Sequence, residues 1–113
     1  MARTITFTDL LAANEYVSAE PDVANSPFNP LERTSKVSLY AASTAAGGLA
    51  GLFCGSDNHG QDLILPIAAA VSTRDHLVAQ GVGMKGQKIS VSVRNSGAGT
   101  PTVNGIVIVE PIA

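Results

Sequence analysis

The sequence predicts a single all-β domain, either an antiparallel β-sandwich or a jelly-roll-like barrel of about seven to eight short strands. Apolar and polar residues alternate over several short stretches, which is the period of strands. Turn-forming residues recur roughly every eight to twelve positions, the spacing of sandwiches and barrels. With 11 glycines in 113 residues, no long helical pattern survives. A chain of this length forms one domain with a modest core, so residues 1–113 are assigned to one sandwich.

The predicted strands follow one another along most of the chain. The alternation of threonines with Ile5 and Phe7 favours a first strand over residues 3–8. Residues 10–13 follow either as a short helical turn or as part of a strand that continues to Val17. Further strands are predicted over residues 36–41, 49–54, 62–67, 77–82, 87–94 and 101–110, and residues 68–71 fit either a strand or a helix.

Glycine and asparagine mark the predicted turns. Residues 55–60 form a turn by composition. Residues 81–86 match G-x-G-x-x-G, but a strand pattern follows where a dinucleotide site needs a helix, so a hairpin turn is expected. Asn104–Gly105 indicates a tight hairpin or a bulge. The run at residues 106–109 is apolar on both faces and needs cover from both sides.

Residues 18–34 are predicted to be an extended, proline-rich arm or loop. Pro21, Pro27 and Pro30 fall within this segment, and proline removes the backbone donor that a strand ladder needs. The segment is longer than an ordinary connection, which favours a docking role. We therefore expect it to clasp a neighbouring subunit, with Phe28 and the three prolines at the contact.

Charge is sparse and unevenly distributed. The net charge is −2 and charged residues make up 14% of the chain, so there is no basic excess and nucleic-acid binding is not expected. The first 32 residues hold five acidic residues against Arg3, whereas Lys85, Lys88 and Arg94 form a mild basic cluster. Either these are two solvated faces, or the acidic arm of one copy contacts the basic edge of the next.

The candidate chemical groups do not form a recognisable catalytic or metal-binding motif. Cys54 is the single cysteine, which excludes an intrachain disulfide and a thiolate zinc site. Asp57, His59 and Asp62 are ligand-type residues, but a calcium loop carries more acidic ligands, so a solvated polar turn is favoured. His59 and His76 are the candidate bases, and no G-x-S-x-G elbow accompanies them. We expect no enzymatic activity and no cofactor.

Targeting signals are also missing from the sequence. No apolar run reaches the ~18 residues of a membrane span, and the first residues do not resemble a secretory signal. We expect a protein that is made in the host cytoplasm without a signal peptide and has no membrane partner.

Low charge and apolar sheets favour an assembly role. Such surfaces usually mark interfaces, so the leading hypothesis is a structural subunit that forms a homo-oligomer, either a trimer or a higher-order shell. The residues expected at its interfaces are Pro21, Pro27, Phe28, Pro30, Lys85, Lys88, Arg94, Ile106 and Ile108.

A resemblance points the same way. Residues 75–79, 86–95 and 102–111 resemble the end of small β-sandwich virion proteins of bacteriophages, namely capsid decoration proteins and small jelly-roll coat proteins. The resemblance implies a capsid decoration (cement) or small coat protein in the virion, without enzymatic activity, with a major capsid protein as a further partner. The missing basic arm favours an outer or cementing position.

Two other functions stay open. A carbohydrate- or ligand-binding β-sandwich module fits the fold, although sugar sites present aromatic faces and this chain has few aromatic residues. An extracellular filament subunit would insert residues 5–7 as a donated strand, but the chain lacks an export signal.

Overall fold

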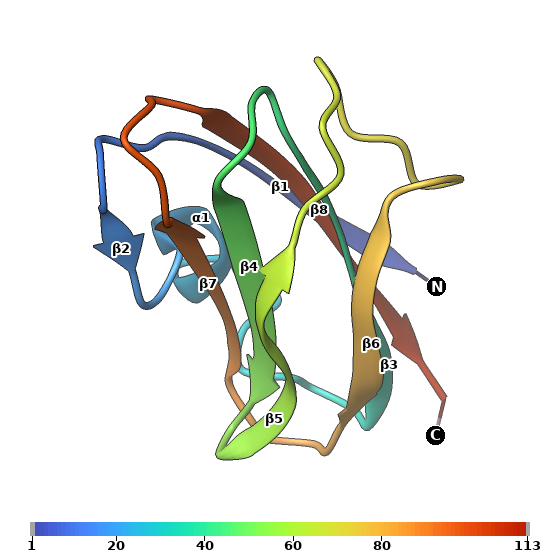
Figure 1. Cartoon of the computed structure of the whole chain (residues 1–113). Coiled ribbons are helices and arrows are strands. Elements are labelled where there is room, and N and C mark those ends of the chain that lie inside the picture. Colours follow the sequence, from blue (N-terminus) through green and yellow to red (C-terminus); the bar gives the residue numbers. More distant parts are fainter. Residues whose placement is uncertain (1, 113) are drawn as a thin grey trace.

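The computed structural model describes residues 2–112 and is a sandwich of two four-stranded antiparallel sheets (Figure 1). One sheet has the order β1-β8-β3-β6 and the other has the order β2-β7-β4-β5. The elements are β1 (Arg3–Leu10), β2 (Tyr16–Val17), α1 (Pro21–Ala24), β3 (Ser35–Ser43), β4 (Gly48–Cys54), β5 (Asp57–Ile64), β6 (Leu77–Gly83), β7 (Ile89–Asn95) and β8 (Thr102–Pro111). The all-β prediction is confirmed.

The strand pairing is nested. β1 pairs with β8, β2 with β7, β3 with β6, and β4 with β5, always antiparallel. A chain whose first and last strands pair, and so on inward, has the topology of the eight-stranded jelly roll. Of the two predicted architectures, the strand order therefore selects the jelly roll.

The core lies between the sheets and follows the predicted alternation. Val37, Leu39 and Ala41 of β3 are fully buried, and the register places Val107 of β8 opposite Leu39. From the second sheet, Val91 and its neighbours meet them. Small aliphatic side chains fill this core, as the composition indicates.

The predicted hairpin or bulge at Asn104–Gly105 is wrong, because β8 runs through both residues without a break. Gly105 lies opposite Phe7 of β1. A Cβ atom at position 105 would overlap the Phe7 ring. The glycine therefore leaves room for the Phe7 side chain, which is 3% exposed and is the aromatic side chain buried in the core.

Two turn predictions differ from the structure. Residues 10–13 do not form a helical turn, since β1 continues to Leu10 and the chain then turns at Asn14, whose φ is 59°. The turn expected over residues 55–60 is shorter, because β5 already begins at Asp57 and Gly55, with φ 61°, makes the reversal.

The segment after β5 is irregular. β5 ends at Ile64, earlier than predicted, and residues 68–71 form neither strand nor helix. A single parallel bridge joins Ile67 to Ser43 at the end of β3. None of the helices in residues 2–112 has the length and apolarity to span a bilayer.

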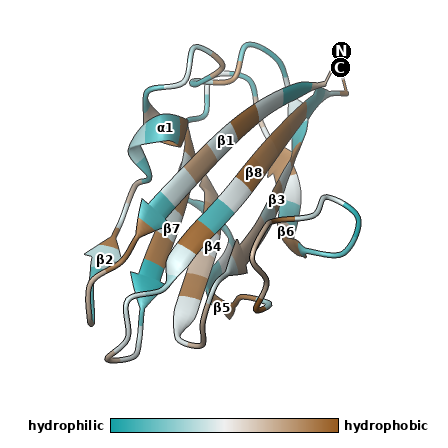
Figure 2. Ribbon diagram, turned by 90° about the horizontal axis from the view of Figure 1, so that it is seen from above, coloured by the Kyte–Doolittle hydropathy of each residue, from teal (hydrophilic) through white to brown (hydrophobic). Residues whose placement is uncertain are grey.

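Residues 18–34 form a loop around α1 and not an extended arm. Val23 and Leu31 are buried. The Asn29 side chain accepts a hydrogen bond from the Ile89 backbone N–H at 2.8 Å and donates one to the Ile89 carbonyl at 2.9 Å. The Glu20 backbone N–H donates to the Val91 carbonyl at 2.8 Å. These contacts fix the segment on its own sandwich, where α1 lies against β1 and β7 (Figure 2).

Candidate assembly surface

The outer face of the β1-β8-β3-β6 sheet carries a row of apolar side chains. The register places Ile106 of β8 between Thr6 of β1 and Tyr40 of β3. Leu77 of β6 lies opposite Tyr40, and Ile108 adds to the row from the next outward position of β8. Figure 2 looks onto this sheet and shows the long hydrophobic stretch of β8 beside the more polar β1. We call this surface the outer apolar face.

Two pairs of polar side chains beside the row are hydrogen-bonded to each other. Thr8 Oγ1 donates to Asn104 Oδ1 at 2.9 Å, and Gln80 Nε2 donates to Ser38 Oγ at 2.9 Å. Covering such groups costs little, because their hydrogen bonds do not have to be replaced. These four side chains can therefore be buried without a large desolvation penalty.

One ion pair lies at an end of the same face. Lys36 Nζ is 3.6 Å from Glu110 Oε1, and both side chains are nearly half exposed. Within residues 2–112, these two are the charged side chains that the strand register places on the outer apolar face.

The predicted interface residues lie in several separate places. Ile106 and Ile108 meet on the outer apolar face and are partly exposed. Pro21, Pro27 and Pro30 are exposed on the loop around α1. No interface role for these residues is tested by the structure of a single chain, so each stays a prediction.

The mild basic cluster of the sequence does not form. Lys88 lies just before β7, next to the turn that holds Lys85, while Arg94 lies near the other end of this strand. Arg94 Nη1 instead stands 3.6 Å from Asp62 Oδ2 of β5, on the outer face of the second sheet. Sequence proximity grouped the three side chains, but strand length separates them.

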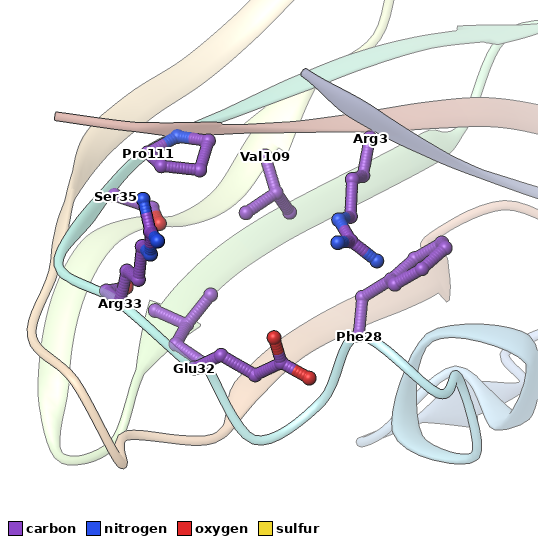
Figure 3. Close-up of a pocket in the computed structure, with 8 residues that line it drawn as sticks. Arg3, Phe28, Glu32, Arg33, Ser35, Val109 and Pro111 are labelled. Carbon is purple, nitrogen blue, oxygen red and sulfur yellow. The ribbon is translucent and has the colours of Figure 1, made fainter. Parts of the chain in front are cut away.

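A cavity of about 260 Å³ opens beside the first residues of β1 (Figure 3). The Arg3 guanidinium lies over the Phe28 ring, 4.8 Å from its centre. The remaining lining residues are Leu31, Glu32, Arg33, Ser35, Val109 and Pro111. The volume is below the ~300–1,000 Å³ of usual ligand sites, and Arg3 occupies a face of the aromatic ring that a sugar would use.

The two aspartates of β5 have separate partners, whereas the ring of His59 lies against Gly81 of β6 and its Nε2 has no hydrogen-bond partner among the described residues. Asp57 Oδ2 accepts from Gln87 Nε2 at 3.2 Å, and Asp62 pairs with Arg94. His76 lies outside β5, and its Nδ1 accepts from the Ser72 backbone N–H at 2.9 Å. Among residues 2–112, no three His, Cys, Asp or Glu side chains gather as metal ligands would.

One polar cluster was missed at the sequence level. Glu20 is 2% exposed, and its Oε1 accepts from the Asp22 backbone N–H at 3.2 Å. Glu20 Oε2 and Asp9 Oδ2 are buried, and apart from each other they have no hydrogen-bond partner in the described part of the chain. Burial and the hydrogen bond with Asp9 raise the pKa of Glu20 to about 8. The alternation along β1 could have predicted the burial of Asp9, since Asp9 follows Ile5 and Phe7 at every second position and so lies on the inner face.

Comparison with known proteins gives little beyond this geometry. No protein-family model matches the chain, and no curated protein matches it either. Among solved structures, the chain is similar to one described as the capsid asymmetric unit of cyanophage Pam1, with 13% sequence identity and a TM-score of 0.40. The alignment covers 98% of this chain and 82% of that chain. A likeness of this strength carries no argument about function.

Proposed function

We propose that this chain is a structural subunit of a bacteriophage virion, a capsid decoration or small coat protein, that assembles with copies of itself through the outer apolar face. The observation that carries the proposal is the row of Ile106, Ile108, Tyr40 and Leu77 on a face whose two charges are paired. Jelly rolls occur in viral capsids and also in lectins, so the surface, more than the topology, supports this choice.

The chemistry of the face suits burial. Threonine and isoleucine are stiff at χ1, and they lose little side-chain freedom when a partner covers them. The Lys36–Glu110 pair is self-complementary, because across a two-fold axis each charge can meet its opposite from the other copy. A second copy is therefore the partner that the face fits, and a major capsid protein is a further candidate.

The area of the face limits what it can do alone. Four strands ~4.8 Å apart, each roughly 25 Å long, cover on the order of 500 Å². A standard stable interface buries ~800 Å² per partner. A lasting assembly of this chain therefore needs a second contact in addition to the outer apolar face.

The test compares two isoleucines. Ile108→Lys puts a charge on the outer apolar face, whereas Ile64→Lys changes a residue that is 85% exposed at the end of β5. Sedimentation of the purified chain at rising concentration should show a self-association that is at least about tenfold weaker in Ile108→Lys, a loss of ~1.4 kcal/mol. Ile64→Lys should associate as the unchanged chain does. Equal behaviour of the two variants would overturn the role of the face.

The virion role has its own test. Mass spectrometry of purified phage particles from the producing host should find the chain as a component with many copies. Its gene should lie beside portal, terminase or tail genes. A chain present in infected cells but missing from purified particles would contradict the proposal. The proposal includes no enzymatic activity and no cofactor.

A further inference from the structure

β1 is an unprotected sheet edge. Its eight residues pair with β8 without a register shift. The other edges are blunted, since β5 has two register shifts, β6 has one, and β2 is two residues long. Proteins protect exposed edges with bulges, prolines, lysines or short strands. β1 is eight residues long and has no bulge, proline or lysine. Its inward-pointing charges, Arg3 and Asp9, lie toward its two ends and α1 contacts it, so the middle of its free side is the part that can pair with another strand.

The hydrogen-bond pattern identifies which backbone groups face that free side. The Leu11 N–H donates to the Pro101 carbonyl at 3.0 Å, which continues the β1–β8 ladder. Antiparallel residues alternate between hydrogen-bonded and non-bonded pairs. The odd-numbered residues of β1 therefore bond to β8, and Thr4, Thr6 and Thr8 direct their N–H and C=O groups outward. All three are exposed.

Space beside this edge is open. A groove of about 560 Å³ runs between β1 and the loop around α1. It is lined by Thr4, Ile5, Thr6, Pro21, Asp22, Asn25, Ser26, Pro27 and Phe28. An approaching strand would lie against two of the three threonines whose backbone groups are free.

We infer that β1 strands of two copies pair antiparallel across a two-fold axis at Thr6, joining two four-stranded sheets into one continuous sheet. The inference rests on the proposed function, because it supplies the second contact that the outer apolar face requires. With Thr6 on the axis, Thr6 pairs with its counterpart and Thr4 pairs with Thr8. All of these are residues whose backbone groups are free, so the ladder can form without disturbing β8.

The side chains of β1 are self-complementary in this register. Ile5 of one copy lies opposite Phe7 of the other, and Arg3 lies opposite Asp9. Shifting the register by two residues in one direction would set Asp9 against Ile5, and in the other direction Arg3 against Phe7. Because directly opposed side chains interact most strongly across strands, the register centred on Thr6 is favoured over both shifts.

The buried carboxyl groups give independent support. The carboxyl groups of Asp9 and Glu20 lie together, and apart from each other Asp9 Oδ2 and Glu20 Oε2 have no hydrogen-bond partner among the described residues of one copy. The Arg3 side chain of a second copy would arrive beside them with five N–H donors in a planar fork. Arg3 is exposed in the single chain, where it stacks on Phe28, so it is available for this contact.

The test replaces one backbone donor. Thr6→Pro removes an N–H that faces the free edge, a position where an edge strand tolerates proline. Thr6→Val keeps the donor and the shape, and is the control. Sedimentation should show dimerisation at least about tenfold weaker in Thr6→Pro and unchanged in Thr6→Val. Arg3→Glu, which sets a carboxylate against Asp9, should weaken it comparably without touching the backbone.

Hydrogen exchange locates the contact. In the unchanged chain, the amides of Thr4, Thr6 and Thr8 should exchange more slowly as concentration rises. The inference would be overturned if these amides exchanged fast at every concentration. It would also be overturned if Arg3→Glu associated as strongly as the unchanged chain.

The outcomes separate the two proposals. Association that survives Thr6→Pro, with fast exchange at these amides, but fails in Ile108→Lys overturns edge pairing and keeps the proposed function. The opposite pattern keeps edge pairing and overturns the role of the face. A chain that stays monomeric at several hundred micromolar overturns both.

Discussion

The two sheets of the sandwich differ in regularity. The β1-β8-β3-β6 sheet has long strands, an outer face whose one ion pair lies at its end, and a straight edge at β1. The β2-β7-β4-β5 sheet has a two-residue strand at one edge and a twice-shifted strand at the other. Its outer face presents the exposed Arg94–Asp62 pair to solvent.

This difference shows how one small chain divides its tasks. Bulges, short strands and surface charge keep the second sheet from pairing with other chains. In the first sheet, β1 has no register shift and is eight residues long, and the charged pair Lys36–Glu110 lies at an end of the outer face. Both proposed contacts with other subunits therefore lie on the first sheet, while the second sheet completes the core.

The largest effect is expected from neighbouring residues of β8 that face opposite sides. Val107→Asp places an unpaired charge in the core, where Val107 is fully buried, and should cost about 4 kcal/mol or more, enough to unfold the chain. Ile108→Asp should stay folded and lose association. Circular dichroism and urea unfolding of both variants measure this. A folded Val107→Asp variant would contradict the assigned faces.

A pH dependence is expected where α1 joins the two sheets. Burial and Asp9 favour the protonated form of Glu20 in the folded chain, and its pKa rises from 4.5 to about 8. The stability that this group contributes is fully present below pH 4.5 and is lost as the pH rises through 8. Thermal melting of the chain at low concentration between pH 4 and 9 should show a falling Tm. Glu20→Gln should flatten this fall, and a Tm that rises equally in both would contradict the assignment.

A smaller effect is expected for the close packing of the first sheet. Gly105→Ala should destabilise the chain by about 1–3 kcal/mol, because the added Cβ overlaps the Phe7 ring. Urea unfolding measures the loss, and adding Phe7→Leu should recover part of it. Gly99→Ala, in the loop after β7 with no atom near its Cβ position, is the control and should change stability by less than about 0.5 kcal/mol.

The sequence predicted those features that depend on neighbouring residues. Alternation identified β1, β3 and β7, because one buried side of a sheet imposes a period of two. An apolar run identified β8, in which the valines are buried and Ile106 and Ile108 are partly exposed. A strand, β7, follows the G-x-G-x-x-G match as predicted, but the predicted hairpin is wrong. Gly81 and Gly83 belong to β6, and the turn at Gly86, with φ 89°, leads to β7 in the other sheet, so the two strands do not pair.

Features that depend on distant residues were not predictable in this way. The role of Gly105 depends on Phe7, almost a whole chain away in sequence. The prolines of residues 18–34 suggested an arm, yet Val23 and Leu31 find a buried site that only the assembled sheets provide. The free side of β1 likewise becomes visible only once β8 is known to cover the other side. The local residue pattern predicts the strands, whereas the strand order decides which faces and edges stay exposed.

The nested pairing also shapes how this chain reaches its folded state. The β4–β5 hairpin is the pairing between strands adjacent in sequence, whereas β1 must wait for β8, about a hundred residues later. Chains dominated by such distant contacts fold slowly, in roughly milliseconds to seconds. During synthesis, β1 therefore leaves the ribosome long before β8. A chaperone in the producing cell would meet β1 as an unpaired, threonine-rich strand.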